Sequence, residues 1–132
     1  MLPMAYIEEL VSYDVARGLK EIGYSDPCDY FYDAHFNLNR YSDKDKIDRN
    51  TNNHHTPSVS APSLYAAQAY LRDTFNIDIM IDPNWSLNSG YHYVIIINSN
   101  FDNPHQQISY PDTTYKESLL NAMQFSISYI LE

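Results

Sequence analysis

The chain of 132 residues has few basic side chains, and this shortage excludes one class of partner. Eight Lys and Arg residues stand against 17 Asp and Glu residues, which gives a net charge of −9. A surface of this sign repels a phosphate backbone, because binding to DNA or RNA depends on Lys and Arg side chains that displace counterions. We therefore expect no direct binding of a nucleic-acid polymer.

Cysteine is equally scarce, since Cys28 is the only one in the chain. A single cysteine cannot form an internal disulfide bond. Its neighbours Asp26 and Asp29 are acidic, and no nearby basic group favours a reactive thiolate. We interpret Cys28 as a reduced, structural residue.

Long apolar runs are also missing. No segment approaches the ~20 consecutive apolar residues of a membrane-spanning helix. Glu8 and Glu9 interrupt the N-terminal segment before an apolar signal-peptide core is formed. These patterns predict a cytoplasmic protein that makes no contact with a membrane.

The familiar motifs of catalysis are absent too. The sequence has no P-loop, no glycine-rich dinucleotide motif, no nucleophile elbow and no calcium-binding loop. Its five histidines are not spaced as a metal site requires; they are His35, His54, His55, His92 and His105. We expect a protein that is not an enzyme and that holds no cofactor or metal.

What the sequence does contain is a clear change of hydrophobic period between residues 61 and 98. Apolar residues recur at helical spacing over 64–75, and Ser63 is placed to cap that helix. The period then becomes two over 77–82, as in a strand with one buried face. The run 91–97 is β-branched or aromatic at almost every position, which predicts a central strand covered on both faces. The two strands are expected to pair antiparallel.

The remaining segments are read in the same way. A first helix within 4–23 begins either after Pro3 or at a Ser12 cap, and Gly23 supplies a left-handed end. Residues 28–41 predict a strand or hairpin that contains Tyr30 and Tyr32.

Two polar segments and a last helix complete the chain. Residues 42–60 predict a long polar loop and 98–111 a polar connector. Thr114 and Glu117 form a capping box for the last helix. The buried face of that helix is expected to combine apolar and small residues, namely Tyr115, Leu119, Leu120, Ala122, Met123, Ser126, Ile127 and Ile130.

These elements together predict an α+β fold in one domain that covers residues 1–132. A small antiparallel sheet of two to four strands is packed by about three helices, in the order α-(β)-α-β-β-α.

The best candidates for a binding site lie in and beside the segment where the period changes. They are Arg72, Trp85, Tyr91 and Tyr93, and they form a predicted ligand-binding site. Aromatic rings stack on a base and an arginine pairs with a phosphate, so this set suits a small nucleotide. The structural alternative is that Tyr91 and Tyr93 pack under a helix while Trp85 covers the edge of the sheet.

Four stretches carry a family resemblance, and they are VSYDVARGLKEIGYSDPC, APSLYAAQAYLRDTFNIDI, YHYVIII and TYKESLLNAMQFSISYI. The chain resembles small proteins encoded by phages and mobile elements of gut Bacteroidota. In that pattern the first helix ends before a Pro-Cys pair, Ala-Pro opens the second helix and Thr-Tyr opens the last. The resemblance implies a phage setting, and it assigns no catalytic residue.

Two functions from different classes follow from that setting. The first is a counter-defence protein that sequesters a small host signalling nucleotide, with a homodimer as the expected assembly. The alternative is an inhibitor that binds a host protein, or a virion accessory protein, through an acidic surface rich in the chain's 13 tyrosines. A nucleotide-cleaving enzyme is a third option, and it requires a histidine or a carboxylate pair in the same pocket.

Overall fold

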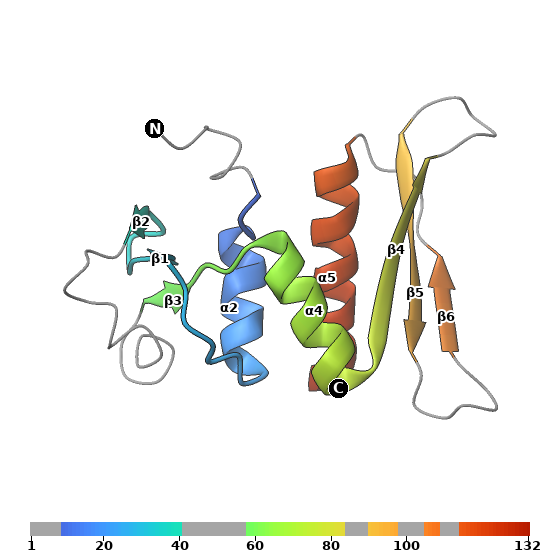
Figure 1. Cartoon of the computed structure of the whole chain (residues 1–132), viewed down its shortest axis with the longest axis horizontal. Coiled ribbons are helices and arrows are strands. Elements are labelled where there is room, and N and C mark those ends of the chain that lie inside the picture. Colours follow the sequence, from blue (N-terminus) through green and yellow to red (C-terminus); the bar gives the residue numbers. More distant parts are fainter. Residues whose placement is uncertain (1–8, 41–57, 84–89, 98–104, 109–113) are drawn as a thin grey trace. The chain divides into compact units, whose positions relative to one another are not determined.

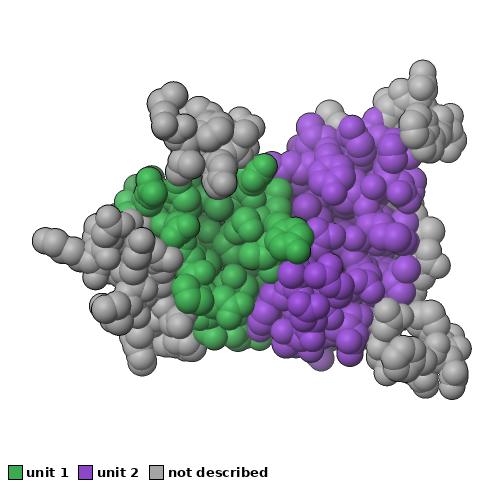
Figure 2. Space-filling view, in the orientation of Figure 1, with its two compact units in different colours: residues 1–67 green, residues 68–132 purple. Residues whose placement is uncertain are grey.

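The computed structural model describes residues 9–40, 58–83, 90–97, 105–108 and 114–132 (Figure 1). Within these ranges the chain has the predicted α+β fold, with three helices and two three-stranded antiparallel sheets. It divides into two compact units, residues 1–67 and 68–132, which Figure 2 colours separately. No helix of this described part is long and apolar enough to cross a membrane.

The first helix, α2 (Tyr13–Glu21), begins at the second of the two predicted starts. The Ser12 hydroxyl accepts a hydrogen bond from the Val15 amide at 3.4 Å. Residues 9–12 are not helical, so the longer helix that starts after Pro3 is wrong over these positions. Leu10 instead forms an antiparallel β-bridge with Ser63, a residue distant in sequence.

The end of α2 is a Schellman motif, as its glycine predicts. Gly23 has φ 99°, and its amide donates to the carbonyl of Lys20 at 3.1 Å. The Tyr24 amide donates to the carbonyl of Leu19 at 2.9 Å. This pair of bonds satisfies carbonyls of the last turn and directs the buried Tyr24 ring into unit 1.

The sheet of unit 1 contains β1 (Tyr30–Tyr32), β2 (Leu38–Arg40) and β3 (Val59–Ser60), in the order β2-β1-β3. The predicted hairpin is confirmed, since β1 and β2 pair antiparallel. The predicted loop 42–60 is wrong at its end, because Val59 and Ser60 are buried and pair with β1. Two residues carry too little pattern to reveal a strand. Residues 42–57 of that loop lie outside the described residues.

The change of hydrophobic period is confirmed by α4 (Leu64–Phe75), β4 (Ile77–Pro83) and β5 (Tyr91–Ile97). Ser63 caps α4, and its hydroxyl accepts from the Ala66 amide at 3.0 Å. β4 and β5 pair antiparallel in the register Ile77↔Ile97. Their aligned residues share one face of the sheet, so Ile77 and Ile79 lie beside Ile97 and Ile95, and all four are buried.

A third strand, β6 (His105–Ile108), pairs with the other side of β5. This corrects the prediction of a polar connector over 98–111, because residues 105–108 form a strand. The other residues of that segment lie outside the described ranges. The segment is polar because an edge strand requires no continuous apolar pattern. β5 is the central strand of the sheet, as predicted.

The last helix, α5 (Tyr115–Leu131), lies against β4 and β5 (Figure 1). The Thr114 cap is confirmed, since its hydroxyl accepts from the Glu117 amide at 3.0 Å. Five of the eight predicted face residues are buried, whereas Leu120 and Ile130 are half-buried, Tyr115 is 51% exposed, and the unpredicted Ser118 is fully buried. The buried residues of α5 are Ser118, Leu119, Ala122, Met123, Ser126 and Ile127. Small side chains allow close packing, so they are buried on α5, whereas the larger Tyr115 at the start of the helix stays exposed.

A side chain of α4 protects the outer edge of β4. The Gln68 side-chain amide donates to the carbonyl of Ile79 at 2.8 Å. Ile79 therefore directs its backbone polar groups away from β5, and its neighbours two residues away on the strand do the same.

Candidate functional site

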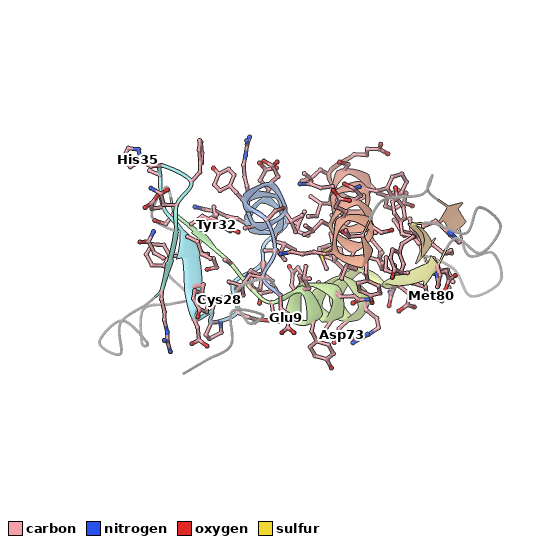
Figure 3. The ribbon with its side chains drawn as sticks, turned by 90° about the horizontal axis from the view of Figure 1, so that it is seen from above. Glu9, Cys28, Tyr32, His35, Asp73 and Met80 are labelled. Carbon is pink, nitrogen blue, oxygen red and sulfur yellow. The ribbon has the colours of Figure 1, made fainter. Side chains whose placement is uncertain are left out.

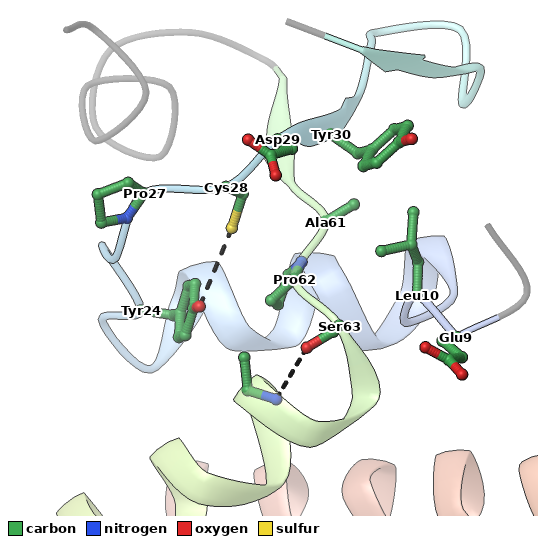
Figure 4. Close-up of a pocket in the computed structure, with 11 residues that line it drawn as sticks. Glu9, Leu10, Tyr24, Pro27, Cys28, Asp29, Tyr30, Ala61, Pro62 and Ser63 are labelled. Atoms are coloured by element: carbon green, nitrogen blue, oxygen red, sulfur yellow. Dashed lines mark hydrogen bonds between the residues drawn. The ribbon is translucent and has the colours of Figure 1, made fainter. Parts of the chain in front are cut away.

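A cavity with a volume of about 230 Å³ lies within unit 1 (Figure 4). Three parts of the chain form it: residues 9–10 before α2, the segment from Tyr24 to Tyr30, and residues 61–66, which lead into α4. The lining residues are Glu9, Leu10, Tyr24, Pro27, Cys28, Asp29, Tyr30, Ala61, Pro62, Ser63 and Ala66.

Backbone hydrogen bonds hold the wall that residues 61–64 provide. The Val11 amide donates to the carbonyl of Pro62 at 3.0 Å, and the Leu64 amide donates to that of Glu9 at 2.6 Å. On the other side, the Ala61 amide donates to the carbonyl of Tyr30 at 2.9 Å. The wall is therefore fixed between two segments that are distant in sequence, and the cavity exists before any ligand arrives.

The Cys28 thiol is part of this pocket. Its sulfur lies 3.9 Å from the Tyr24 hydroxyl and 3.6 Å from the Asp26 carbonyl oxygen, both within hydrogen-bonding distance. Burial raises the pKa of Cys28 to about 11, and the nearby carboxylates of Asp26 and Asp29 act in the same direction. At neutral pH the group is a thiol, which is a poor nucleophile.

The raised pKa of Cys28 gives a direct prediction. Its pKa is about 11 instead of the ordinary 9.0, so the folded protein should react with iodoacetamide at pH 8 about a hundredfold more slowly than the unfolded protein. The rate is measured by mass spectrometry in buffer and in urea, with glutathione as the control for the effect of urea on the reagent. Equal rates in the two solutions would contradict the buried thiol.

Two carboxylates give the pocket its charge. Glu9 and Asp29 are exposed and belong to the lining, and none of the eleven lining residues is Lys, Arg or His. Tyr24 and Tyr30 also line the pocket; Tyr24 is buried and Tyr30 is half-buried. Aromatic faces and carboxylates both attract cations, so the arrangement suits a positively charged group.

The predicted ligand-binding residues lie elsewhere. Arg72 is on α4, its side chain is 47% exposed, and its Nε lies 3.3 Å from the Asp73 carboxylate. Tyr91 and Tyr93 are half-buried on the face of β5 that α5 covers, and the Tyr91 ring meets the Tyr115 ring at 6.0 Å. Trp85 lies outside the described residues. Arg72, Tyr91 and Tyr93 are not among the lining residues of the pocket in unit 1, and the role of all four residues in ligand binding stays a prediction.

Sequence reasoning missed the pocket for a physical reason. Cys28 was interpreted as structural and Tyr30 as a strand residue, and both statements hold for the local structure. The pocket forms only when residues 9–11 pair with residues 62–64. Neither segment has a sequence pattern that predicts this contact. The concentration of aromatic and acidic residues over 24–33 was the one usable signal.

No group of three or more potential metal ligands occurs among the residues that the structure describes. His35 is exposed at the β1–β2 turn, and His92 is half-buried on β5. His54 and His55 lie outside the described ranges.

Comparison with protein-family models, with curated proteins and with solved structures finds no match for this chain. The resemblance to phage proteins stays a prediction.

Proposed function

We propose that the protein is a non-enzymatic binding protein that holds a basic side chain of a protein partner in the pocket of unit 1. The observation that carries this proposal is the lining of the pocket. It combines Tyr24 and Tyr30 with the carboxylates of Glu9 and Asp29, and none of its described lining residues is basic.

The size of the pocket favours a side chain over a nucleotide. Sites for small molecules and cofactors usually enclose about 300–1,000 Å³. The cavity of about 230 Å³ is smaller than this range. A nucleotide would also bring its phosphates toward two carboxylates, and like charges repel. Between the two functions that the sequence suggests, the geometry therefore favours the protein-binding inhibitor or virion accessory protein over the sequestration of a nucleotide.

Catalysis has little support from the lining residues. Cys28 is protonated at neutral pH because burial raises its pKa to about 11. Among the described lining residues there is no histidine to act as a base for this thiol. The net charge of −9 adds to the attraction of a basic partner and should make binding weaken as salt increases.

Defined peptides test this function. A fluorescein-labelled peptide with one Arg in a Gly/Ser background is titrated with the full chain at low ionic strength, and the Kd is measured by fluorescence anisotropy. We expect the combined Glu9→Gln and Asp29→Asn variant to bind roughly threefold to tenfold more weakly, since exposed ion pairs each contribute about 0.2–1 kcal/mol.

A second pair of substitutions gives the matched control. Asp82 and Glu132 are exposed and do not line the pocket, so Asp82→Asn with Glu132→Gln removes the same charge elsewhere. This control should keep nearly the affinity of the parent protein. Equal weakening in both variants would show a general charge effect and refute the pocket as the site. A cyclic dinucleotide that raises the melting temperature, together with no peptide binding, would restore the nucleotide hypothesis.

A further inference from the structure

The turn between β1 and β2 carries a phenylalanine where a glycine is usual. The Asp33 amide donates to the carbonyl of Asn37, and the Phe36 amide donates to that of Asp33, both at 3.0 Å. This is a three-residue hairpin loop, whose last position is left-handed and normally glycine. Phe36 occupies that position with φ 68°.

Burial does not explain this choice of residue. A non-glycine residue in the left-handed region costs about 1–2 kcal/mol. The Phe36 side chain is nevertheless 63% exposed. Its ring meets the Tyr13 ring at a centroid distance of 4.5 Å, and such a contact returns about 0.5–1.5 kcal/mol. The result is an exposed ring that is held in a fixed position, and strained residues of this kind cluster at binding sites.

Asp33 makes the turn rigid. Its Oδ1 accepts from the amides of His35 (2.9 Å) and Asn37 (3.0 Å), and its Oδ2 accepts from the Asn39 side chain (2.9 Å). These hydrogen bonds, that of Asn37 first, lower the pKa of Asp33. The loop therefore carries a negative charge at neutral pH beside preorganised rings.

The pocket and this turn are joined along β1. Tyr30 lines the pocket, and Tyr32, two residues on, faces the same side of the strand. The Tyr32 ring meets the Tyr13 ring at 5.7 Å, and its hydroxyl donates to the carbonyl of Val11 at 2.7 Å. In Figure 3, Tyr32 lies between Cys28 in the pocket and His35 at the turn.

We propose that the surface formed by Tyr13, Tyr32 and Phe36 binds a second cationic side chain of the same basic segment whose first side chain enters the pocket. This inference rests on the proposed function. The partner is an extended protein segment with two Arg or Lys residues, because the faces of aromatic rings attract cations and the neighbouring carboxylate complements their charge.

The spacing of the two basic residues follows from the strand. Asp33 lies three positions after Tyr30, and a strand rises about 3.3 Å per residue, so the two sites are roughly 10 Å apart along the chain. An extended ligand covers this distance in three to four residues. Alternate side chains of an extended segment point to the same side, so the best ligand should carry basic residues at positions i and i+2 or i+4.

Peptides with two Arg residues separated by zero to five Gly/Ser residues test the inference. We expect the matched spacing to bind about fivefold to tenfold more tightly than the one-Arg peptide. Phe36→Gly should remove this gain and leave the affinity for the one-Arg peptide unchanged. Glycine suits the left-handed backbone, so this variant should melt at or above the temperature of the parent protein. Phe36→Asn, which also adopts this backbone, is the second variant.

Tyr65→Ala is the matched control, because Tyr65 is 78% exposed in unit 1 and belongs neither to the turn nor to the pocket lining. It should preserve the gain. If Phe36→Gly and Tyr65→Ala reduce the gain equally, or if no spacing binds more tightly than the one-Arg peptide, the second site is refuted while the proposed function stands. If even the one-Arg peptide fails to bind, the proposed function itself is refuted.

Discussion

Replacing Ile95 with alanine is expected to lower the free energy of unfolding by about 2–5 kcal/mol, the usual loss for a large aliphatic residue in a core. Ile95 has no exposed surface. It lies in the middle of the central strand β5, opposite Ile79 on β4, and on the face that α5 covers. Alanine there would leave a cavity that the two neighbouring strands cannot fill.

Urea denaturation followed by circular dichroism measures this loss. The control is Met80→Ala on the adjacent strand, because Met80 is 45% exposed and its removal opens no enclosed cavity. That change should alter the free energy by no more than about 0.5 kcal/mol. Similar midpoints for the two variants would contradict the packing of β5 described above.

Leu19→Ala should cause a loss of the same size, about 2–5 kcal/mol, from a different part of the chain. Leu19 is fully buried on α2 in unit 1. The boundary between the two units falls inside α4, which is one continuous helix. We therefore expect both variants to shift one common unfolding transition, as the prediction of a single domain requires.

Two probes follow the transition separately in the two units. Cys28 alkylation reports on unit 1, and hydrogen exchange of the β5 amides, measured by mass spectrometry, reports on unit 2. Tyr65→Ala serves as the exposed control. If Leu19→Ala exposes Cys28 and leaves the exchange of the β5 amides unchanged, the units unfold independently and the single-domain prediction is wrong.

The parts of the fold that sequence predicts are those with local causes. The caps Ser12, Ser63 and Thr114 each bond to an amide three residues later, so a short motif suffices to find them. The alternation over 77–82 likewise reappears as buried Ile77 and Ile79 beside exposed Met80. Local hydrogen bonding and hydrophobic period act within a few residues, and they can be read directly.

What sequence did not predict depends on contacts between distant segments. β3 and β6 are short edge strands, and they depend on pairing with β1 and β5 for their structure. The pocket wall needs the bond from the Val11 amide to the Pro62 carbonyl, which joins residues 51 positions apart. The strained turn at Phe36 was hidden too, because the αL position of a hairpin loop is recognised by glycine or asparagine and here carries neither.

The hydrogen bond from Gln68 to Ile79 has a consequence for association of the chain with itself. A strand edge with unpaired carbonyls is a template for adding a strand from another molecule. The Ile79 carbonyl in the middle of the β4 edge is already occupied, at 2.8 Å. A second copy that extended this sheet across β4 would first have to displace the Gln68 amide. The Gln68 side chain thus makes the middle of this edge less available for pairing with another strand.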